Sequence, residues 1–370
     1  MYDLISVDDH IIEPPNVWKD RLPAKYVDVG PHVIEEDGRE YWLYEDQRGE
    51  TMGLNAVAGK PIEQWSMEPA RYSDMIPGCY DPVARAQDLA QDNIVASLCF
   101  PTLPRFGGTL FLTFKDKELA DLCVTAYNDW LIDEWCASVP GLYIPMVICQ
   151  LWDPDLAAAE IRRCSELGAR ALSFVENPVP LGLPSFYTDH WDPVWRACEE
   201  TRTAVNLHIG TSGQMVWPTP VDSSFEIAIM LAQVNAAMAV VNLIESPVPY
   251  SFPDIQIALS EGGIGWIPAQ LERCDRMYER HRGWARKDGL KPSDVFRRNF
   301  YGAFVEDEVG VALRDRIGVD RIMWECDYPH VEAPWPGSQV VVEKLLAGIP
   351  PQEAELITNG NARRLYRWPA

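Results

Sequence analysis

Eight short apolar runs recur along the chain of 370 residues, and segments with helical spacing separate most of them. Each run is rich in β-branched and other apolar residues and is followed by polar, proline or glycine residues, as buried strands are. Strands that alternate with helices form parallel sheets, and eight such units close into a barrel. The sequence therefore predicts an α/β fold, a (β/α)₈ TIM barrel, with strands at 4–10, 95–101, 142–149, 169–176, 204–210, 256–263, 300–306 and 321–330.

The longest interruption of this alternation, residues 14–90, lies between the first two runs. It contains two stretches of alternating apolar and polar residues that flank Asp37-Gly38, a pair typical of tight hairpin turns. We expect a β-hairpin within a loop insertion that caps the barrel mouth. A barrel can absorb such an insertion, so residues 1–370 are predicted to form one domain.

The chain is acidic, with a formal net charge of -23, and 47% of its residues are hydrophobic. Binding to nucleic-acid phosphates needs clustered Lys and Arg, so this balance argues against it. The nine cysteines are scattered without a CxxC pair, which is typical of reduced thiols and not of a disulfide framework or a zinc ribbon. The N-terminal residues lack a secretory pattern and no run of about 18 apolar residues occurs, so we expect a cytoplasmic protein that does not span a membrane.

Residues of the types that bind metals follow several predicted strands at their C-terminal ends, where barrel enzymes carry their active sites. The candidate ligands come from the first, fifth, sixth and eighth strands and from the segment just past the first: Asp8, His10, Glu13, His208, Glu261, Asp327 and His330. Mixed carboxylate and imidazole donors without thiolate suit zinc, manganese or iron. These donors exceed the needs of one ion, so we expect a divalent metal centre of one ion or possibly two.

Local spacing supports this interpretation. Asp8 and His10 stand two residues apart, so both side chains point to one face of a strand. Pro329 breaks the eighth run, which lets Asp327 point inward while His330 folds back over the site. Each residue taken alone has a structural explanation, such as a cap or a turn, but their joint occurrence at three strand ends favours a functional site.

Several segments resemble a known family: "SVDDHIIEPPNVW", "VNLHIGTSG", "SEGGIGWIP", "DYPH" and the terminal "NGNARRLYRW". They are similar to the amidohydrolase-related proteins of the aminocarboxymuconate-semialdehyde decarboxylase branch of the amidohydrolase superfamily. The resemblance extends from residue 4 to about residue 367. It implies a distorted (β/α)₈ barrel, a divalent metal at the mouth, and non-oxidative decarboxylation or hydrolysis of a small carbonyl or carboxylate compound. It also implies a homodimer, and a hetero-oligomer with a related barrel stays open.

The resemblance assigns roles to individual residues. Asp8 and His10 fill the carboxylate-x-histidine pair of the first strand, and the later ligands fall on His208 and Asp327. At the sixth strand the related decarboxylases place a histidine, often with an acid/base role, where this chain has Glu261. The candidate catalytic residues are Glu261, Asp327 and His330.

Three functions of different classes remain open on this sequence. The first is a metal-dependent lyase or hydrolase in which Asp327 or Glu261 moves the proton. The second is a dinuclear iron or iron/manganese oxygenase that hydroxylates a small acid, with Glu13, Glu261 and His330 helping to hold the second ion. The third is an inactive barrel that serves as a partner subunit. The sequence motifs of serine hydrolases, P-loop enzymes and Rossmann dehydrogenases do not occur.

The sequence also offers candidate contacts for a small-molecule substrate. Arg105 follows the second predicted strand, where its guanidinium either clamps a carboxylate or belongs to a surface loop; both interpretations stay open. His190 lies in the loop after the fourth strand. Four aromatic residues lie in segments that could line an apolar or aromatic pocket: Phe106, Tyr187, Trp217 and Trp335. These residues do not identify the substrate.

Overall fold

The computed structural model describes residues 1–49, 54–66, 71–281 and 289–369. All eight predicted strands are confirmed, and the third is divided at Pro145, which has no N–H group for the strand ladder. The parallel strands are β1 (Leu4–Ile11), β5 (Ile94–Pro101), β6 (Tyr143–Ile144), β7 (Met146–Val147), β8 (Ala171–Phe174), β9 (Ala204–His208), β10 (Ile257–Ser260), β11 (Phe300–Phe304) and β12 (Ile322–Trp324).

The strands form two parallel arcs, β1-β5-β6 and β7-β8-β9-β10-β11-β12. The arcs join at Pro145 on one side. On the other side they meet between β1 and the segment after β12, where the Asp327 amide donates to the Asp8 carbonyl and the His10 amide to the Tyr328 carbonyl, both at 2.7 Å. The result is the distorted (β/α)₈ barrel that the sequence predicts.

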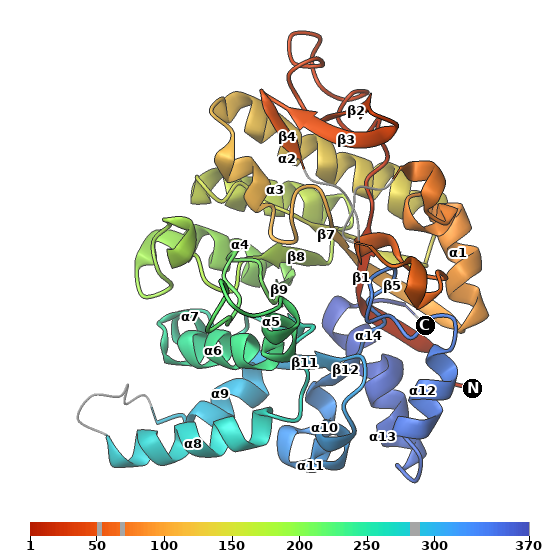
Figure 1. Ribbon diagram of the computed structural model, residues 1–370. Coiled ribbons are helices and arrows are strands. Elements are labelled where there is room, and N and C mark those ends of the chain that lie inside the picture. Colours follow the sequence, from red (N-terminus) through yellow and green to blue (C-terminus); the bar gives the residue numbers. More distant parts are fainter. Residues whose placement is uncertain (50–53, 67–70, 282–288, 370) are drawn as a thin grey trace.

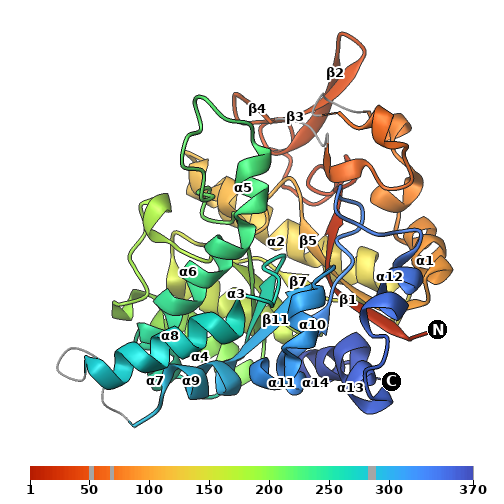
Figure 2. The same ribbon diagram turned by 60° about the horizontal axis from the view of Figure 1, so that its bottom comes forward.

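Helices surround these strands, as Figure 1 shows from one side and Figure 2 after a turn. Small alanines on β5, β8, β9, β10 and β11 face the narrow barrel interior, and Tyr366 packs with them. A larger apolar cluster fills the space between strands and helices. The helices are α1 (Pro82–Gln91), α2 (Lys117–Trp130), α3 (Pro154–Glu166), α4 (Asp192–Thr201), α5 (Glu226–Met230), α6 (Ala232–Glu245), α7 (Val248–Ser251), α8 (Ile267–Arg280), α9 (Pro292–Asn299), α10 (Glu308–Ala312), α11 (Arg314–Ile317), α12 (Ser338–Leu345), α13 (Pro351–Glu355) and α14 (Asn361–Tyr366).

The insertion after β1 contains an antiparallel sheet of β2 (His32–Glu36), β3 (Arg39–Tyr44) and β4 (Gln47–Gly49), drawn in red at one end of the molecule in Figure 1. The predicted hairpin is confirmed. Its turn residues Asp37 and Gly38 both have positive φ angles, 53° and 73°, which the twist of a two-residue hairpin turn requires. The strand β4 is an addition to the prediction.

Backbone hydrogen bonds tie the insertion to the barrel. The amides of Val57 and Ala58 both donate to the Pro329 carbonyl at 3.1 Å. The role of residues 14–90 as a cap over the mouth stays a prediction, and parts of that segment, 50–53 and 67–70, lie outside the described residues. None of the described helices is both long enough and apolar enough to cross a membrane.

Candidate metal centre

Six of the seven predicted ligands lie together at the C-terminal ends of the strands. Two contacts centre on His10, whose Nε2 atom lies 3.2 Å from Asp8 Oδ1 and 3.1 Å from Asp327 Oδ1. The His208 Nε2 atom lies 3.5 Å from Asp8 Oδ2 and 3.4 Å from Glu261 Oε2. His330 Nδ1 lies 3.0 Å from Asp327 Oδ1. Residues from β1, β9 and the segments after β10 and β12 thus converge on one place.

A β-bulge in β1 aims Asp8 and His10 into the barrel mouth. Ser6 pairs with Ser97 but Asp9 pairs with Cys99, so β1 contains one residue more than β5 over the same length. Ile5 and Val7 face the barrel interior, and strict alternation would turn the next even-numbered side chains away from it. The extra residue reverses the alternation, as bulges next to active sites often do.

The segment after β12 folds back over β1. Asp327 has a φ angle of 63°, and the His330 amide donates to the Asp327 carbonyl at 2.8 Å to close the turn. The His330 ring then stacks on the His10 ring, with 3.6 Å between centroids and 17° between planes. Asp9 fixes this arrangement from behind, because its Oδ1 accepts from the Tyr328 amide at 3.0 Å and from Ser6 Oγ at 2.9 Å.

The converging polar atoms have no hydrogen-bond partner among the described residues. This holds for both carboxylate oxygens of Asp8 and of Asp327 and for the Nε2 atoms of His10 and His208, all of which are buried. Buried polar groups are nearly always hydrogen-bonded or bound to a metal. Two triads, Asp8-His10-His208 and His10-Asp327-His330, each offer ligand atoms within 4.8 Å of one another. The residues present therefore fit a divalent metal ion.

The pKa shifts of the candidate ligands also agree with metal binding. Burial lowers the pKa of His208 to about 3, and it lowers the pKa of His10 well below its usual value, so both imidazoles are neutral and can bind a metal. Burial and then the neighbouring carboxylates raise the pKa of Asp8. Burial and the neighbouring acids likewise raise the pKa of Asp327. A bound cation would oppose this repulsion.

Arg85 connects two of the chain segments that carry candidate ligands. It is fully buried on α1, and its guanidinium donates to the carbonyl oxygens of Gly78 and His10, both at 2.6 Å. The same group lies 4.4 Å from the centroid of the Tyr328 ring. Arg85 thus links the backbone of a candidate ligand on β1 to the segment that carries Asp327 and His330.

Glu13 lies apart from this cluster. Its buried carboxylate accepts hydrogen bonds from the amides of Thr102 and Leu103, at 2.9 and 2.8 Å, after β5. Burial raises the pKa of Glu13 to about 7. Backbone donors already satisfy the carboxylate. Among the described residues, it forms no contact with the other candidate ligands.

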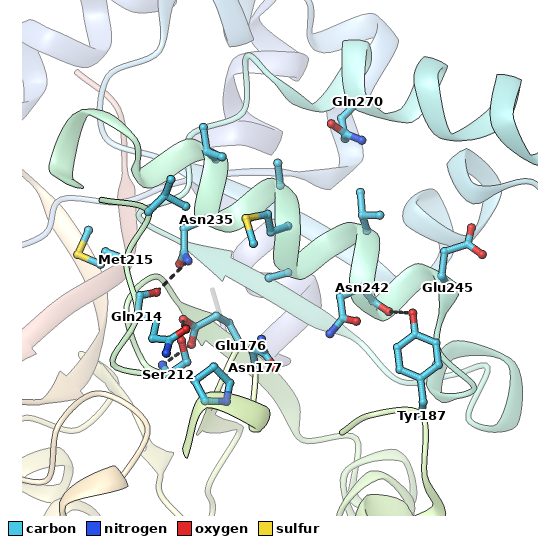
Figure 3. A pocket seen from close by; sticks show the side chains of 17 residues that line it. Glu176, Asn177, Tyr187, Ser212, Gln214, Met215, Asn235, Asn242, Glu245 and Gln270 are labelled. Atoms are coloured by element: carbon cyan, nitrogen blue, oxygen red, sulfur yellow. Dashed lines mark hydrogen bonds between the residues drawn. The ribbon is translucent and has the colours of Figure 1, made fainter. Parts of the chain in front are cut away.

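The four predicted substrate contacts do not share one pocket. Arg105 is exposed and lines a polar cavity of about 530 Å³ near Glu13. Tyr187 lines a separate cavity of about 680 Å³ beside α6, where its hydroxyl donates to the Asn242 carbonyl (Figure 3). The Trp217 indole donates to Ser223 Oγ, and the His190 ring packs edge-on against Trp191.

Phe106, which the sequence offers as a possible pocket residue, packs its ring against His10 and His208, with centroids 4.6 and 4.3 Å away. Sequence reasoning did not single out two further residues at the centre. Glu325 is fully buried beside Glu261, and Glu332 lines the same cavity as both. Glu325 stands two residues before Asp327, the same spacing as Asp8 and His10, and that spacing could have revealed it.

Buried carboxylates and neutral imidazoles that converge at the C-terminal strand ends of a (β/α)₈ barrel define a class of metal-binding barrel proteins. Residues 27–368 match the family model described as amidohydrolase, and the chain belongs to this family. No functionally curated protein matches the sequence.

Solved structures share the fold over the whole chain. An amidohydrolase from Mycobacterium avium subsp. paratuberculosis is 22% identical, with 99% of each chain covered and a TM-score of 0.77. A 5-carboxyvanillate decarboxylase from Sphingomonas paucimobilis is 22% identical, with 100% of each chain covered and a TM-score of 0.70. A dihydroxybenzoic acid decarboxylase from a Polaromonas species, with bound manganese and the inhibitor 2-nitroresorcinol, is 16% identical; 99% of this chain and 97% of that chain are covered, with a TM-score of 0.63.

Proposed function

We propose that this protein is a metal-dependent lyase that removes CO₂ from a small hydroxylated aromatic acid without oxidation. The observation that carries the proposal is the convergence of Asp8, His10, His208 and Asp327, whose buried ligand atoms have no hydrogen-bond partner among the described residues. Two of the structures that share the fold are decarboxylases of hydroxylated aromatic acids. The substrate class that we propose is taken from these two decarboxylases.

Asp8, His10, His208 and Asp327 would hold the ion. Two carboxylates and two neutral imidazoles suit Mn²⁺ or Zn²⁺, and the manganese in one related structure makes Mn²⁺ the first choice. When bound, the divalent ion would orient the substrate and withdraw electron density from its carboxylate and hydroxyl oxygens.

Asp327 is positioned to move the proton. Loss of CO₂ breaks a carbon–carbon bond and leaves the electron pair on the ring carbon, which must then take up a proton. Asp327 Oδ1 lies between His10 Nε2 and His330 Nδ1, at 3.1 and 3.0 Å. The His330 side chain is 10% exposed, so it can pass a proton inward to Asp327. Phe106, packed on both His10 and His208, would exclude water and stack on an aromatic substrate.

We also propose a role for Arg105 at the end of the substrate that lies away from the metal. Its side chain lines the polar cavity near Glu13, and the next residue, Phe106, packs on His10. We assign to Arg105 the binding of a second anionic or hydroxyl group. Tyr187, His190 and Trp217 lie elsewhere and have no part in this proposal. The homodimer and the cytoplasmic location stay predictions, and the comparisons lend no support to the oxygenase or the inactive-barrel alternative.

The test is CO₂ release from a panel of hydroxylated benzoic acids that includes 5-carboxyvanillate and 2,6-dihydroxybenzoate. We expect release with Mn²⁺-loaded protein, none after metal removal, and none with Asp327→Asn. A parallel panel of esters and amides examines hydrolysis. Turnover of that panel without CO₂ release from any acid would contradict the lyase assignment.

A further inference from the structure

The end of the barrel opposite the candidate metal centre carries a separate cavity of about 430 Å³. Thr203 and Gln256, which line it, directly precede β9 and β10, so the cavity lies at the N-terminal ends of the strands. Tyr301 and Leu365 form part of its wall and belong to the apolar cluster inside the barrel. Barrel enzymes carry their active sites at the other end, so this cavity is separate from the proposed decarboxylation site.

Arginine side chains give this cavity its chemical character. Arg202, Arg364 and Arg367 line it, and Arg170 directly precedes β8 at the same end of the barrel. Burial lowers the pKa of Arg367 below its usual value, and the positive charges of Arg170 and Arg202 lower it further. This repulsion shows that the three guanidinium groups lie near one another. The chain as a whole has a formal net charge of -23, so a cluster of positive charge stands out on it.

Three of these arginines lack a partner for their charge. Among the described residues, the side chains of Arg202 and Arg367 form neither an ion pair nor a hydrogen bond, and the Nε atom of Arg170 is buried without an acceptor. Arg364 differs, because its guanidinium lies 4.0 Å from Asp320 Oδ2. Buried polar groups nearly always have a hydrogen-bond partner, so an acceptor is missing at this place.

The acidic residues of the cavity do not supply that acceptor. Glu199 and Asp254 both line it, and Glu199 Oε1 accepts from the Asp254 amide at 2.9 Å. In the described chain, neither carboxylate forms an ion pair with the arginines of the cavity. Because the arginines also outnumber the acids, the cavity keeps an excess of positive charge.

Arg202 and Arg367 stand at backbone positions that seldom carry a long side chain. They cap the C-terminal ends of α4 and α14, with left-handed φ angles of 56° and 52°. Glycine is the usual residue at such caps, because a side chain strains the backbone there. Two arginines at such caps, both lining one cavity, point to a role for their guanidinium groups.

We propose that this cavity binds a phosphate dianion, either free or as the phosphate group of a small organic molecule. Arg202 and Arg367 would donate to its oxygens, with Arg170 beside them. The planar guanidinium matches phosphate oxygens, and a doubly charged anion offsets the repulsion among three cations better than a single carboxylate does. The wall at Tyr301 and Leu365 offers a contact surface for an organic group. This inference holds whatever reaction the metal centre supports.

The test is calorimetric titration of the full-length protein, as purified, with inorganic phosphate at constant ionic strength. We expect about one phosphate per wild-type chain. Arg202→Gln and Arg367→Gln should each weaken binding about 10- to 100-fold, because each removes a charge-assisted hydrogen bond. Arg196→Gln is the matched control, because Arg196 is exposed on α4 and lies outside the cavity; it loses the same charge and should bind as wild type does. Circular dichroism checks the fold of each variant.

Titration with glycerol 3-phosphate distinguishes the two sources of the phosphate. Tighter binding than that of inorganic phosphate indicates an organic phosphate, and equal or weaker binding indicates the free ion. Acetate that bound as tightly as phosphate would overturn the proposal. Phosphate bound at the metal centre instead would be retained in Arg202→Gln and Arg367→Gln and lost in His208→Ala, and that result would overturn the proposal as well. So would the absence of phosphate binding to the wild-type protein.

Discussion

Replacement of Arg85 by methionine should weaken both the fold and metal binding. Methionine keeps the apolar stem but leaves the buried carbonyl oxygens of Gly78 and His10 without their donors, at about 1–3 kcal/mol each. Loss of the contact with the Tyr328 ring costs about 2 kcal/mol more, and removal of a buried charge that needs desolvation offsets part of the sum. We expect a net loss of about 3 kcal/mol, a large share of a typical unfolding free energy of about 5–15 kcal/mol.

The effect on the metal follows from the His10 contact. Without Arg85, the backbone of β1 loses its link to the segment that carries Asp327, so Mn²⁺ affinity should fall about 10- to 100-fold. Urea denaturation of metal-free protein measures the first effect, and calorimetry with Mn²⁺ measures the second. Arg162→Met is the control, because Arg162 forms an exposed pair with Glu200 and should change neither quantity. Wild-type stability and Mn²⁺ affinity in the Arg85→Met variant would show that Arg85 supports neither the fold nor the metal site.

Three further predictions concern the ligands, a buried acid and the barrel interior. His208→Ala and Asp327→Ala should each lower Mn²⁺ affinity more than 100-fold while circular dichroism stays unchanged; retained affinity in either variant would remove that residue from the ligand set. Burial raises the pKa of Glu176 from 4.5 to about 7, so the native state holds a proton that the unfolded chain releases, and the unfolding free energy should fall as pH rises from 4.5 to 7. Urea titrations should show a smaller fall in Glu176→Gln, and an identical pH profile would contradict the assignment. Tyr366→Phe leaves the buried Asn206 Oδ1, 2.6 Å from the tyrosine hydroxyl, without its donor; stability should drop by about 1–3 kcal/mol with metal content unchanged, and metal loss would show that the barrel interior and the site are coupled.

The strands, and the gathering of most candidate ligands, could be predicted because their signals are local. An apolar run followed by polar residues marks a buried strand, and parallel strands bring their ends to one face. This rule alone predicts that four candidate ligands gather at one face: Asp8, His10, His208 and Asp327. The bulge in β1 is different, because nothing in "SVDDH" signals the extra residue, and it arises from the pairing with Ser97 and Cys99.

The candidate residues that the structure does not bring to the metal cluster lie in loops. Glu13 stands three residues after His10, but the chain turns it toward the amides of Thr102 and Leu103. Tyr187 and Trp217 lie in segments without regular periodicity. Tyr187 contacts the Asn242 carbonyl on α6, 55 residues away, whereas Trp217 contacts the nearby Ser223. The contacts of Glu13 and Tyr187 join distant parts of the chain and leave no local pattern.

Anomalous scattering from a crystal soaked in Mn²⁺ shows whether the four converging side chains bind a metal. We expect a peak surrounded by Asp8, His10, His208 and Asp327, at coordination distances of about 2.0–2.3 Å. The same crystal of His208→Ala should lose that peak. Absence of a peak at this cluster in the wild-type protein, or a peak elsewhere with none between these four side chains, would show that they are not the metal ligands.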